Sequence, residues 1–145
     1  MLTREYGEVL LRHVKAETAH KMEETLATLT PDCVFDDRAF NRVWRGRDAA
    51  RAYYRIWWDA FGIAPHNSTR YAPAPDLVIV ETHFVGRHQG PFLGVAPTGR
   101  AVDVPMTIFV SFANGLMSGE RFYWNLATLL EQIGVKLPVA LPAAA

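Results

Sequence analysis

Near its end the chain reads VDVPMTIFVSFANGLMSGERFYWNLATLLEQIG, residues 102–134, and this stretch decides the fold. Nearly every second residue from Val102 to Phe112 is hydrophobic, which is typical of a β-strand. Asn114-Gly115 is a strong hairpin signal and predicts that residues 116–124 return antiparallel to that strand. Apolar residues at helical spacing follow, and Gly134 ends the predicted helix. The stretch therefore predicts a strand, a tight turn, a second strand and a closing helix.

The residues before this stretch predict helices first and strands later. The first helical segment breaks near Thr18, and Asp48 is the predicted N-cap of the next helix. The predicted elements are helices at 1–30 and 48–61, strands at 33–35, 66–71, 76–88 and 100–112, and a loop at 36–47. This order predicts an α+β domain in which helices gather on one face of a curved antiparallel sheet and can enclose a pocket.

Bulk composition excludes several classes of partner. Lys plus Arg and Asp plus Glu both number 15, so no net charge favours nucleic acid or an anionic membrane. Cys33 is the only cysteine, which excludes an internal disulfide and fits a reducing compartment. No apolar run approaches the roughly 20 residues of a membrane span. We expect a cytoplasmic protein with one domain at 1–137 and a loose tail at 138–145.

Three segments resemble one known family: GPFLGVAPTGRAV (residues 90–102), the Asn114-Gly115 hairpin, and YWNLATLLEQIG (residues 123–134). Together they are similar to the SnoaL-like polyketide cyclases, within the nuclear transport factor two-like and ketosteroid isomerase-like superfamily. The resemblance implies a cone-shaped sheet with three to four helices on its concave face. It also implies a small, cofactor-free, commonly oligomeric protein with an apolar pocket, in which a carboxylate handles a C–H proton beside a carbonyl.

Asn125 is where the chain departs from that family. In the closing motif the family's catalytic Asp corresponds to Asn125, and an amide is not a base. Asn125 could orient a ligand or donate to an enolate oxygen while another residue moves the proton. It also directly precedes the helical stripe that begins at Leu126, so it is equally well interpreted as a helix N-cap.

Glu81 and His83 are the candidate bases. Alternate residues of a strand share a face, so both lie beside Leu77, Ile79 and Val85 on an apolar face. A carboxylate and an imidazole in apolar surroundings could form a tuned acid–base pair. The alternative is a salt-bridged or solvent-facing pair.

The predicted ligand-binding residues come from two elements. On the last strand Arg121 and Tyr123 share a face with Asn125, and would supply a cation and a hydroxyl if Asn125 faces a pocket. Aromatic residues of the 48–61 helix would form the pocket wall, although at helical spacing they also suit a plain core. These aromatic residues are Tyr53, Trp57 and Phe61.

The sequence predicts no metal or cofactor. Asp36 and Asp37 are adjacent and point to opposite sides of a strand, and no His or Cys with ligand spacing accompanies them. No phosphate-binding glycine loop or nucleophile motif occurs.

Three functions remain open: a cyclase- or isomerase-type enzyme acting on a polyketide- or steroid-like carbonyl compound, a non-catalytic module that binds a small apolar ligand, and a dimeric structural domain. The apolar stripe from Val102 to Phe112 is either core or a sheet-to-sheet surface of a homodimer or higher oligomer.

Overall fold

The fold was analysed in a computed structural model that describes residues 1–144. Ten elements form one sheet and its helices. Their bounds are α1 Arg4–Thr18, α2 Met22–Leu26, β1 Leu29–Asp37, β2 Arg42–Arg45, α3 Arg47–Phe61, β3 Ala64–Ala74, β4 Leu77–Arg87, β5 Ala101–Ala113, β6 Leu116–Trp124 and α4 Leu126–Gln132. The predicted hairpin and closing helix are therefore confirmed, and residue 145 of the predicted tail lies outside the described residues.

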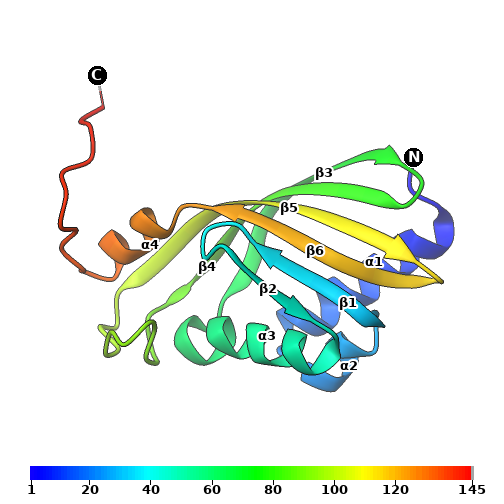
Figure 1. Ribbon diagram of the computed structural model, residues 1–145, viewed down its shortest axis with the longest axis horizontal. Coiled ribbons are helices and arrows are strands. Elements are labelled where there is room, and N and C mark those ends of the chain that lie inside the picture. Colours follow the sequence, from blue (N-terminus) through cyan, green and yellow to red (C-terminus); the bar gives the residue numbers. More distant parts are fainter. Residues whose placement is uncertain (145) are drawn as a thin grey trace.

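The sheet is mixed rather than fully antiparallel, which corrects the prediction. Its strand order is β2-β1-β6-β5-β4-β3. The β5–β6 hairpin and the β3–β4–β5 meander are antiparallel, but β1 pairs parallel to β6. β1 enters the sheet beside a strand that comes some eighty residues later, a pairing that local sequence does not encode. Figure 1 shows these two strands side by side, with β1 between β6 and the short edge strand β2.

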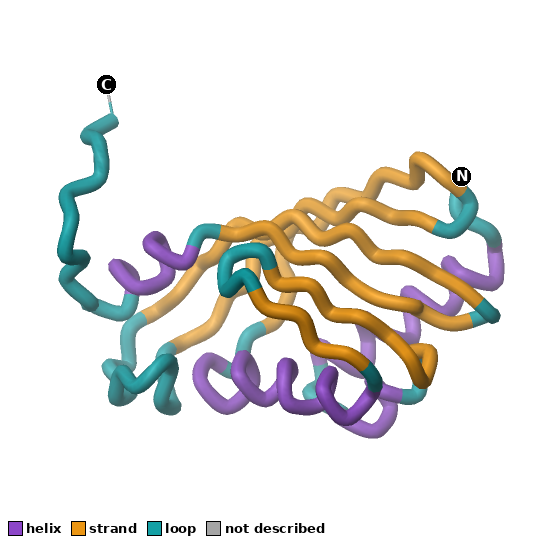
Figure 2. The backbone as a smooth tube through the Cα atoms, in the orientation of Figure 1, coloured by secondary structure: helices purple, strands orange, loops and turns teal. Residues whose placement is uncertain are grey.

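Helices α1, α2 and α3 cover one side of the sheet, as the tube in Figure 2 shows, and α4 continues from β6 at one end. We call the side that faces α1 and α3 the inner face and the opposite side the outer face. Val80, Ile108 and Phe122 pair across three strands and are buried on the inner face. The stripe from Val102 to Phe112 is buried there too, so its interpretation as core is confirmed.

Two predicted boundaries were wrong. β1 begins at Leu29, so the last residues of the segment predicted as helix belong to a strand. β2 lies inside the segment predicted as a loop, because Arg42 to Arg45 pair with the end of β1. The predicted N-cap was also displaced: Gly46, at φ +83°, precedes α3, and Asp48 lies in its first turn. A positive φ is accessible to glycine without a Cβ clash.

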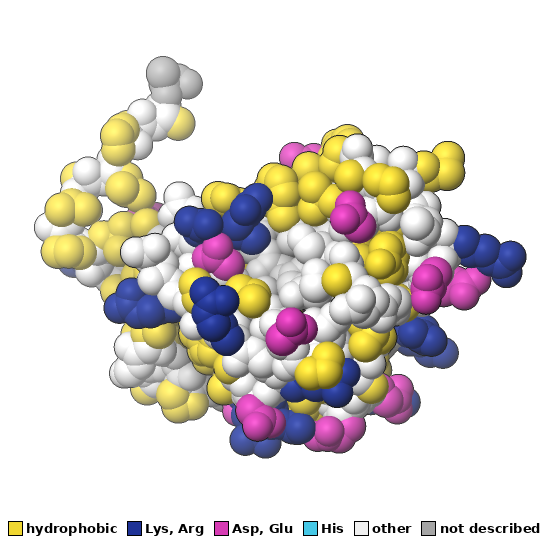
Figure 3. Space-filling model, turned by 45° about the vertical axis from the view of Figure 1, so that its right-hand side comes forward, with side chains coloured by type: hydrophobic (Ala, Val, Ile, Leu, Met, Phe, Trp, Pro, Cys, Tyr) yellow, Lys and Arg dark blue, Asp and Glu magenta, His cyan; other side chains and the backbone are white. Residues whose placement is uncertain are grey.

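Beyond α4 the chain extends away from the sheet. Val139 and Leu141 are exposed in this segment, and Figure 3 shows its hydrophobic side chains standing apart from the rest of the molecule. Within residues 1–144 no helix is both long and apolar enough to cross a membrane.

Candidate active site

Two small hollows lie between the inner face of the sheet and the helices. The first, the aromatic hollow, encloses about 20 Å³ and is lined by Glu17, Tyr53, Tyr54, Trp57, Trp58, Ile63, Phe84, Met106 and Phe122. The second, the polar hollow, encloses about 40 Å³ and includes His13, Glu17, Thr82, Phe84 and Glu120 in its lining. Each is large enough for only one to a few waters. Glu17 and Phe84 line both, so the two hollows are neighbours.

His13 of α1 is held in one tautomer by a chain of hydrogen bonds. The Thr28 hydroxyl donates to the Thr25 carbonyl at 2.6 Å, so it accepts from His13 Nδ1–H at 2.7 Å. The free Nε2 then accepts from the Tyr54 hydroxyl at 3.2 Å. Burial lowers the pKa of His13 to about 4, because the charged imidazolium would lose its hydration. His13 is therefore a neutral acceptor at pH 7.

Glu120 is a carboxyl group inside the core. On β6 it pairs with Val110 of β5 and with Phe35 of β1, both buried, and only 7% of it is exposed. Among the described residues its Oε2 has no hydrogen-bond partner. Burial raises the pKa of Glu120 well above its ordinary value; the negative charge of Glu17 adds to this, and the Tyr54 hydroxyl partly offsets it.

Glu17 lies one helical turn after His13, with Oε2 3.8 Å from His13 Nε2 and 15% of its side chain exposed. Burial raises the pKa of Glu17 to about 7. Buried carboxyl groups are usually paired with a cation or fully hydrogen-bonded. Among the described residues Glu17 and Glu120 have no such full set of partners, and buried carboxyl groups with raised pKa values are candidates for proton transfer.

A third buried carboxylate has a structural role. Asp37 accepts four hydrogen bonds: from the backbone N–H groups of Ala39 and Phe40, from the Tyr53 hydroxyl and from Trp124 Nε1. These bonds saturate its oxygens and tie the β1–β2 turn to α3 and β6. Asp37 therefore positions Tyr53 in the wall of the aromatic hollow.

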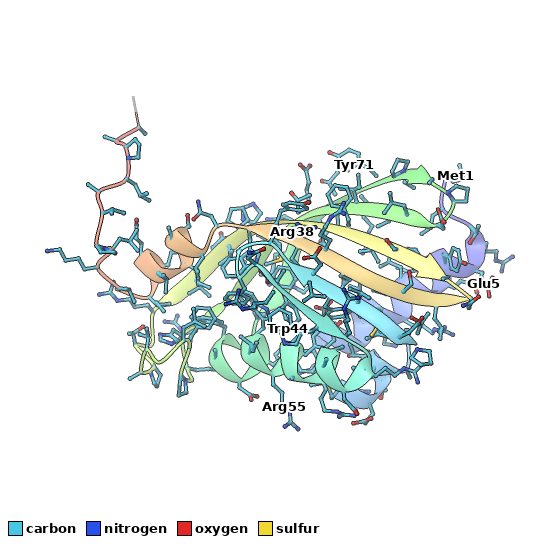
Figure 4. All side chains as sticks on the ribbon, in the orientation of Figure 1. Met1, Glu5, Arg38, Trp44, Arg55 and Tyr71 are labelled. Atoms are coloured by element: carbon cyan, nitrogen blue, oxygen red, sulfur yellow. The ribbon has the colours of Figure 1, made fainter. Side chains whose placement is uncertain are left out.

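The aromatic residues predicted on α3 lie inside. Tyr53 and Trp57 line the aromatic hollow. Phe61 is buried behind them, with its ring 6.0 Å from that of Trp57 and 5.4 Å from that of His88. Arg55 of the same helix points away from the sheet, as Figure 4 shows.

Glu81, His83 and Tyr123 are brought together, but on the outer face. They line an open hollow of about 360 Å³ that also includes Thr107. His83 Nδ1 lies 2.6 Å from Asp103 Oδ1, and Glu81 accepts from the Tyr71 hydroxyl at 3.1 Å. In Figure 4, Tyr71 projects from the side of the sheet opposite α3. The solvent-facing alternative for Glu81 and His83 is therefore confirmed.

Arg121 also lies on the outer face, with its guanidinium 4.6 Å from the centre of the Phe109 ring. Asn125 caps α4: its side chain accepts from the Thr128 backbone N–H at 3.1 Å. The capping interpretation is confirmed, and Asn125 lines neither the aromatic nor the polar hollow.

Sequence reasoning did not single out His13, Glu17, Tyr54 or Glu120 as site residues. His13 lies at helical spacing from Val9 and Leu10, and Glu17 is its i+4 neighbour, so the sequence carried a visible signal for the pair. Glu120 alternates with Phe122 and Trp124, which marked the core face of β6. Tyr54 carried no comparable signal.

The family model for SnoaL-like polyketide cyclases matches residues 7–133. The chain belongs to this family. Among the solved structures that share its fold are three with different assignments or sources. A protein assigned as a SnoaL-like polyketide cyclase from Jannaschia sp. CCS1 is 25% identical with a TM-score of 0.77, covering 92% of this chain and 94% of the other. A protein assigned as a polyketide cyclase from Silicibacter sp. TM1040 is 15% identical with a TM-score of 0.82, covering 93% and 99%.

The third structure is AclR from Streptomyces galilaeus, assigned as a hydroxylase. It is 23% identical with a TM-score of 0.76, covering 93% of this chain and 83% of AclR. No curated protein matches the chain. The family and its cone-shaped α+β fold are thus shown, and the different assignments of these relatives mean that the reaction must be argued from the site itself.

Proposed function

We propose that the chain is a cofactor-free enzyme of the cyclase or isomerase type, which moves protons within an apolar polyketide- or steroid-like carbonyl compound. The observation that carries the proposal is Glu120: a buried carboxyl group with an unpartnered oxygen, in a hollow that Glu17 and His13 also line. A buried, unpartnered acid destabilises a fold, so its presence here supports a functional role.

Each interior group has a separate role in this proposal. Glu120 in its ionised form takes a proton from the carbon beside the carbonyl and returns it to a second atom of the substrate. The Tyr54 hydroxyl, which donates its one proton to His13 Nε2 in the free protein, turns away from His13 and donates to the enolate oxygen that forms in between. The aromatic walls exclude water, which strengthens these interactions. Asn125 takes no proton in this scheme.

Deuterium exchange tests the proposal without the natural substrate. 2-Tetralone is a compact apolar ketone with acidic C–H groups, and its exchange in D₂O is followed by NMR. The wild-type protein should accelerate exchange, and Glu120→Gln should reduce the acceleration by about 100-fold or more. Glu81→Gln, the same substitution on the outer face, is the matched control. No acceleration by the wild-type protein would favour a non-catalytic binding module.

The outer hollow is a second candidate site, in which His83, oriented by Asp103, would act as the base beside Glu81. It is open to solvent and offers no apolar enclosure. Loss of exchange in Glu81→Gln or His83→Gln, with full activity in Glu120→Gln, would move the reaction to this side.

We also propose that two copies associate through the outer face. Tyr71 is 51% and Tyr123 43% exposed there, and Ile79 and Phe109 lie half-buried between them. Large exposed aromatic residues around partly buried apolar ones are typical of an interface. Light scattering should give twice the monomer mass, and Tyr123→Glu should halve it. Such a dimer would cover the outer hollow, which favours the interior as the site of reaction.

The buried thiol of Cys33 supports our assignment to the cytoplasm.

A further inference from the structure

The aromatic hollow has an unusual combination of walls. Six of its lining residues are aromatic, and the only charged one is a carboxyl group, Glu17. The rings come from α3, β4 and β6 and meet at several angles: Trp58 is tilted 30° against Tyr54, and Tyr53 is nearly edge-on to Trp57 at 68°. No basic side chain belongs to the described lining of this hollow.

We propose that the aromatic hollow binds a small alkylammonium group, with Glu17 as its counter-ion. The faces of aromatic rings attract cations, and a desolvated cation gains most from several rings and one carboxylate together. The inference deepens the proposed function, because it gives the substrate an amine at one end. Only one part of this inference depends on the proposed function, namely that the substrate also carries a carbonyl group, which would lie beside Glu120 in the polar hollow.

Electrostatics of the whole interior favour a cation over an anion. Glu17 and Glu120 are both carboxyl groups, and neither forms an ion pair with Lys or Arg among the described residues. Arg70 lines the polar hollow but is exposed and does not line the aromatic hollow, so a positive ligand group there would supply the counter-charge to Glu17. Glu17 also raises the pKa of Glu120, so pairing Glu17 with a cation would lower the pKa of Glu120 and make it a better base.

The hollow must widen to admit such a group, because its 20 Å³ holds a single water. The wall able to move is Trp58, which is only half-buried. Its outer side stacks on the His20 ring at 4.9 Å, and His20 Nε2 lies 3.0 Å from the Ile63 carbonyl oxygen. His20 lies in the short turn between α1 and α2, at φ +52°. Rotation of this stacked pair would open the hollow at its outer wall.

Binding of a cation should also release protons, since it stabilises the ionised form of Glu17. The other titratable groups around Glu17 come from every neighbouring element: His13 on α1, His20 in the α1–α2 turn, Tyr53 and Tyr54 on α3, Arg70 on β3 and Glu120 on β6. The pKa of Glu17 is about 7, so at pH 7 roughly half a proton should leave it for each cation bound.

A matched pair of ligands tests the inference with the wild-type protein. Choline and 3,3-dimethylbutan-1-ol have the same shape and differ in charge. Calorimetry at pH 7 should show choline binding at least tenfold more tightly, with quenching or a shift of tryptophan fluorescence. Repeating the titration in buffers of different ionisation enthalpy measures the protons released. Equal affinity for the two compounds, or no binding of choline at about 20 mM, would overturn the inference.

Variants locate the binding. Glu17→Gln should remove the preference for choline over its isostere, and Trp58→Leu should weaken choline binding at least several-fold. Glu8→Gln removes an exposed carboxylate from the same helix and should leave both affinities unchanged. An unchanged preference in Glu17→Gln would sink the assignment. The two proposals can fail separately. Choline binding tests the role of Glu17 in the aromatic hollow, whereas deuterium exchange tests the role of Glu120 in proton transfer.

Discussion

The two faces of the sheet carry similar residues in opposite surroundings. On the inner side, His13, Glu17 and Glu120 lie among aromatic rings, and Glu120 Oε2 has no partner in the described structure. On the outer side, Glu81 and His83 have partners, Tyr71 and Asp103, and water reaches both groups. The difference teaches that residue type alone does not identify a reactive site: burial without a partner separates a tuned carboxyl group from a solvated one.

The largest expected effect is on the pH dependence of stability. The pKa of Glu17 rises from 4.5 to about 7 on folding, so its contribution is complete below pH 4.5 and is lost as the pH rises through 7. Because a tenfold change in proton affinity corresponds to about 1.4 kcal/mol, this rise corresponds to about 3 kcal/mol of folding free energy. The stability of Glu17→Gln relative to wild type should therefore rise by about this amount between pH 4 and pH 8.

Urea unfolding across this pH range measures the change, and Glu81→Gln controls for the loss of one carboxylate. If the free energies of unfolding of Glu17→Gln and wild type vary with pH in parallel, then folding does not raise the pKa of Glu17, and the inner and outer faces do not differ in this respect.

His13 should change stability with pH in the opposite direction. Its pKa falls from 6.5 to about 4 on folding, so its contribution to the folding free energy is present above pH 6.5 and is lost as the pH falls through 4.

The next effect is on catalysis and compares one hydroxyl on each side. Tyr54→Phe removes the proposed donor to the enolate oxygen, and should lower the rate of deuterium exchange by about 100-fold. Tyr123→Phe makes the same change on the outer face and should leave the rate unchanged. NMR measurement of exchange into 2-tetralone decides the matter. The reverse ranking would place the reaction on the outer face.

The third prediction concerns a substitution that should raise stability and abolish activity at the same time. Glu120→Leu replaces a buried acid that has one unpartnered oxygen by an apolar side chain of similar size, and should stabilise the fold by about 2 kcal/mol while abolishing exchange. Glu81→Leu, on the exposed face, should change stability by less than about 0.5 kcal/mol. Thermal unfolding at pH 7 measures both. Destabilisation by Glu120→Leu would argue that Glu120 has a structural partner.

The smallest effect concerns the helix cap. Asn125→Ala removes the acceptor for the Thr128 N–H and should destabilise the fold by about 1 kcal/mol. Asn125→Asp preserves the cap and should leave both stability and exchange close to wild type. If Asn125→Asp instead creates exchange activity that the wild type lacks, the interior mechanism is wrong and the native chain is not this enzyme.

Prediction from sequence succeeded where the signal was local. The β5–β6 hairpin follows from Asn114-Gly115, and α4 follows from its apolar stripe. Prediction shortened β1 to residues 33–35 and missed β2, and it did not give the parallel pairing of β1 with β6, which joins segments far apart in the chain. The family resemblance supplied the overall architecture that periodicity alone left incomplete.

The candidate site was harder to predict for a specific reason. The parity of β4 was read correctly, and its pairing with β5 runs unbroken. But Leu77, Val78, Ile79 and Val80 are apolar on both faces of the strand, so the sequence did not reveal which face was core. The face with Glu81 and His83 was expected to line the pocket, but the face with Val78 and Val80 is the one that packs into the core.

By itself, the sequence determined the family, the hairpin, the closing helix and the absence of the usual Asp at Asn125, since each depends on neighbouring residues or on a short motif. Only the tertiary structure decided which carboxyl groups lose their water. Glu17 and Glu120 come from opposite ends of the chain, and their pKa values are raised only when α1 packs against the inner face of β6. Desolvation depends on every neighbour in space, and so these raised pKa values emerge from packing.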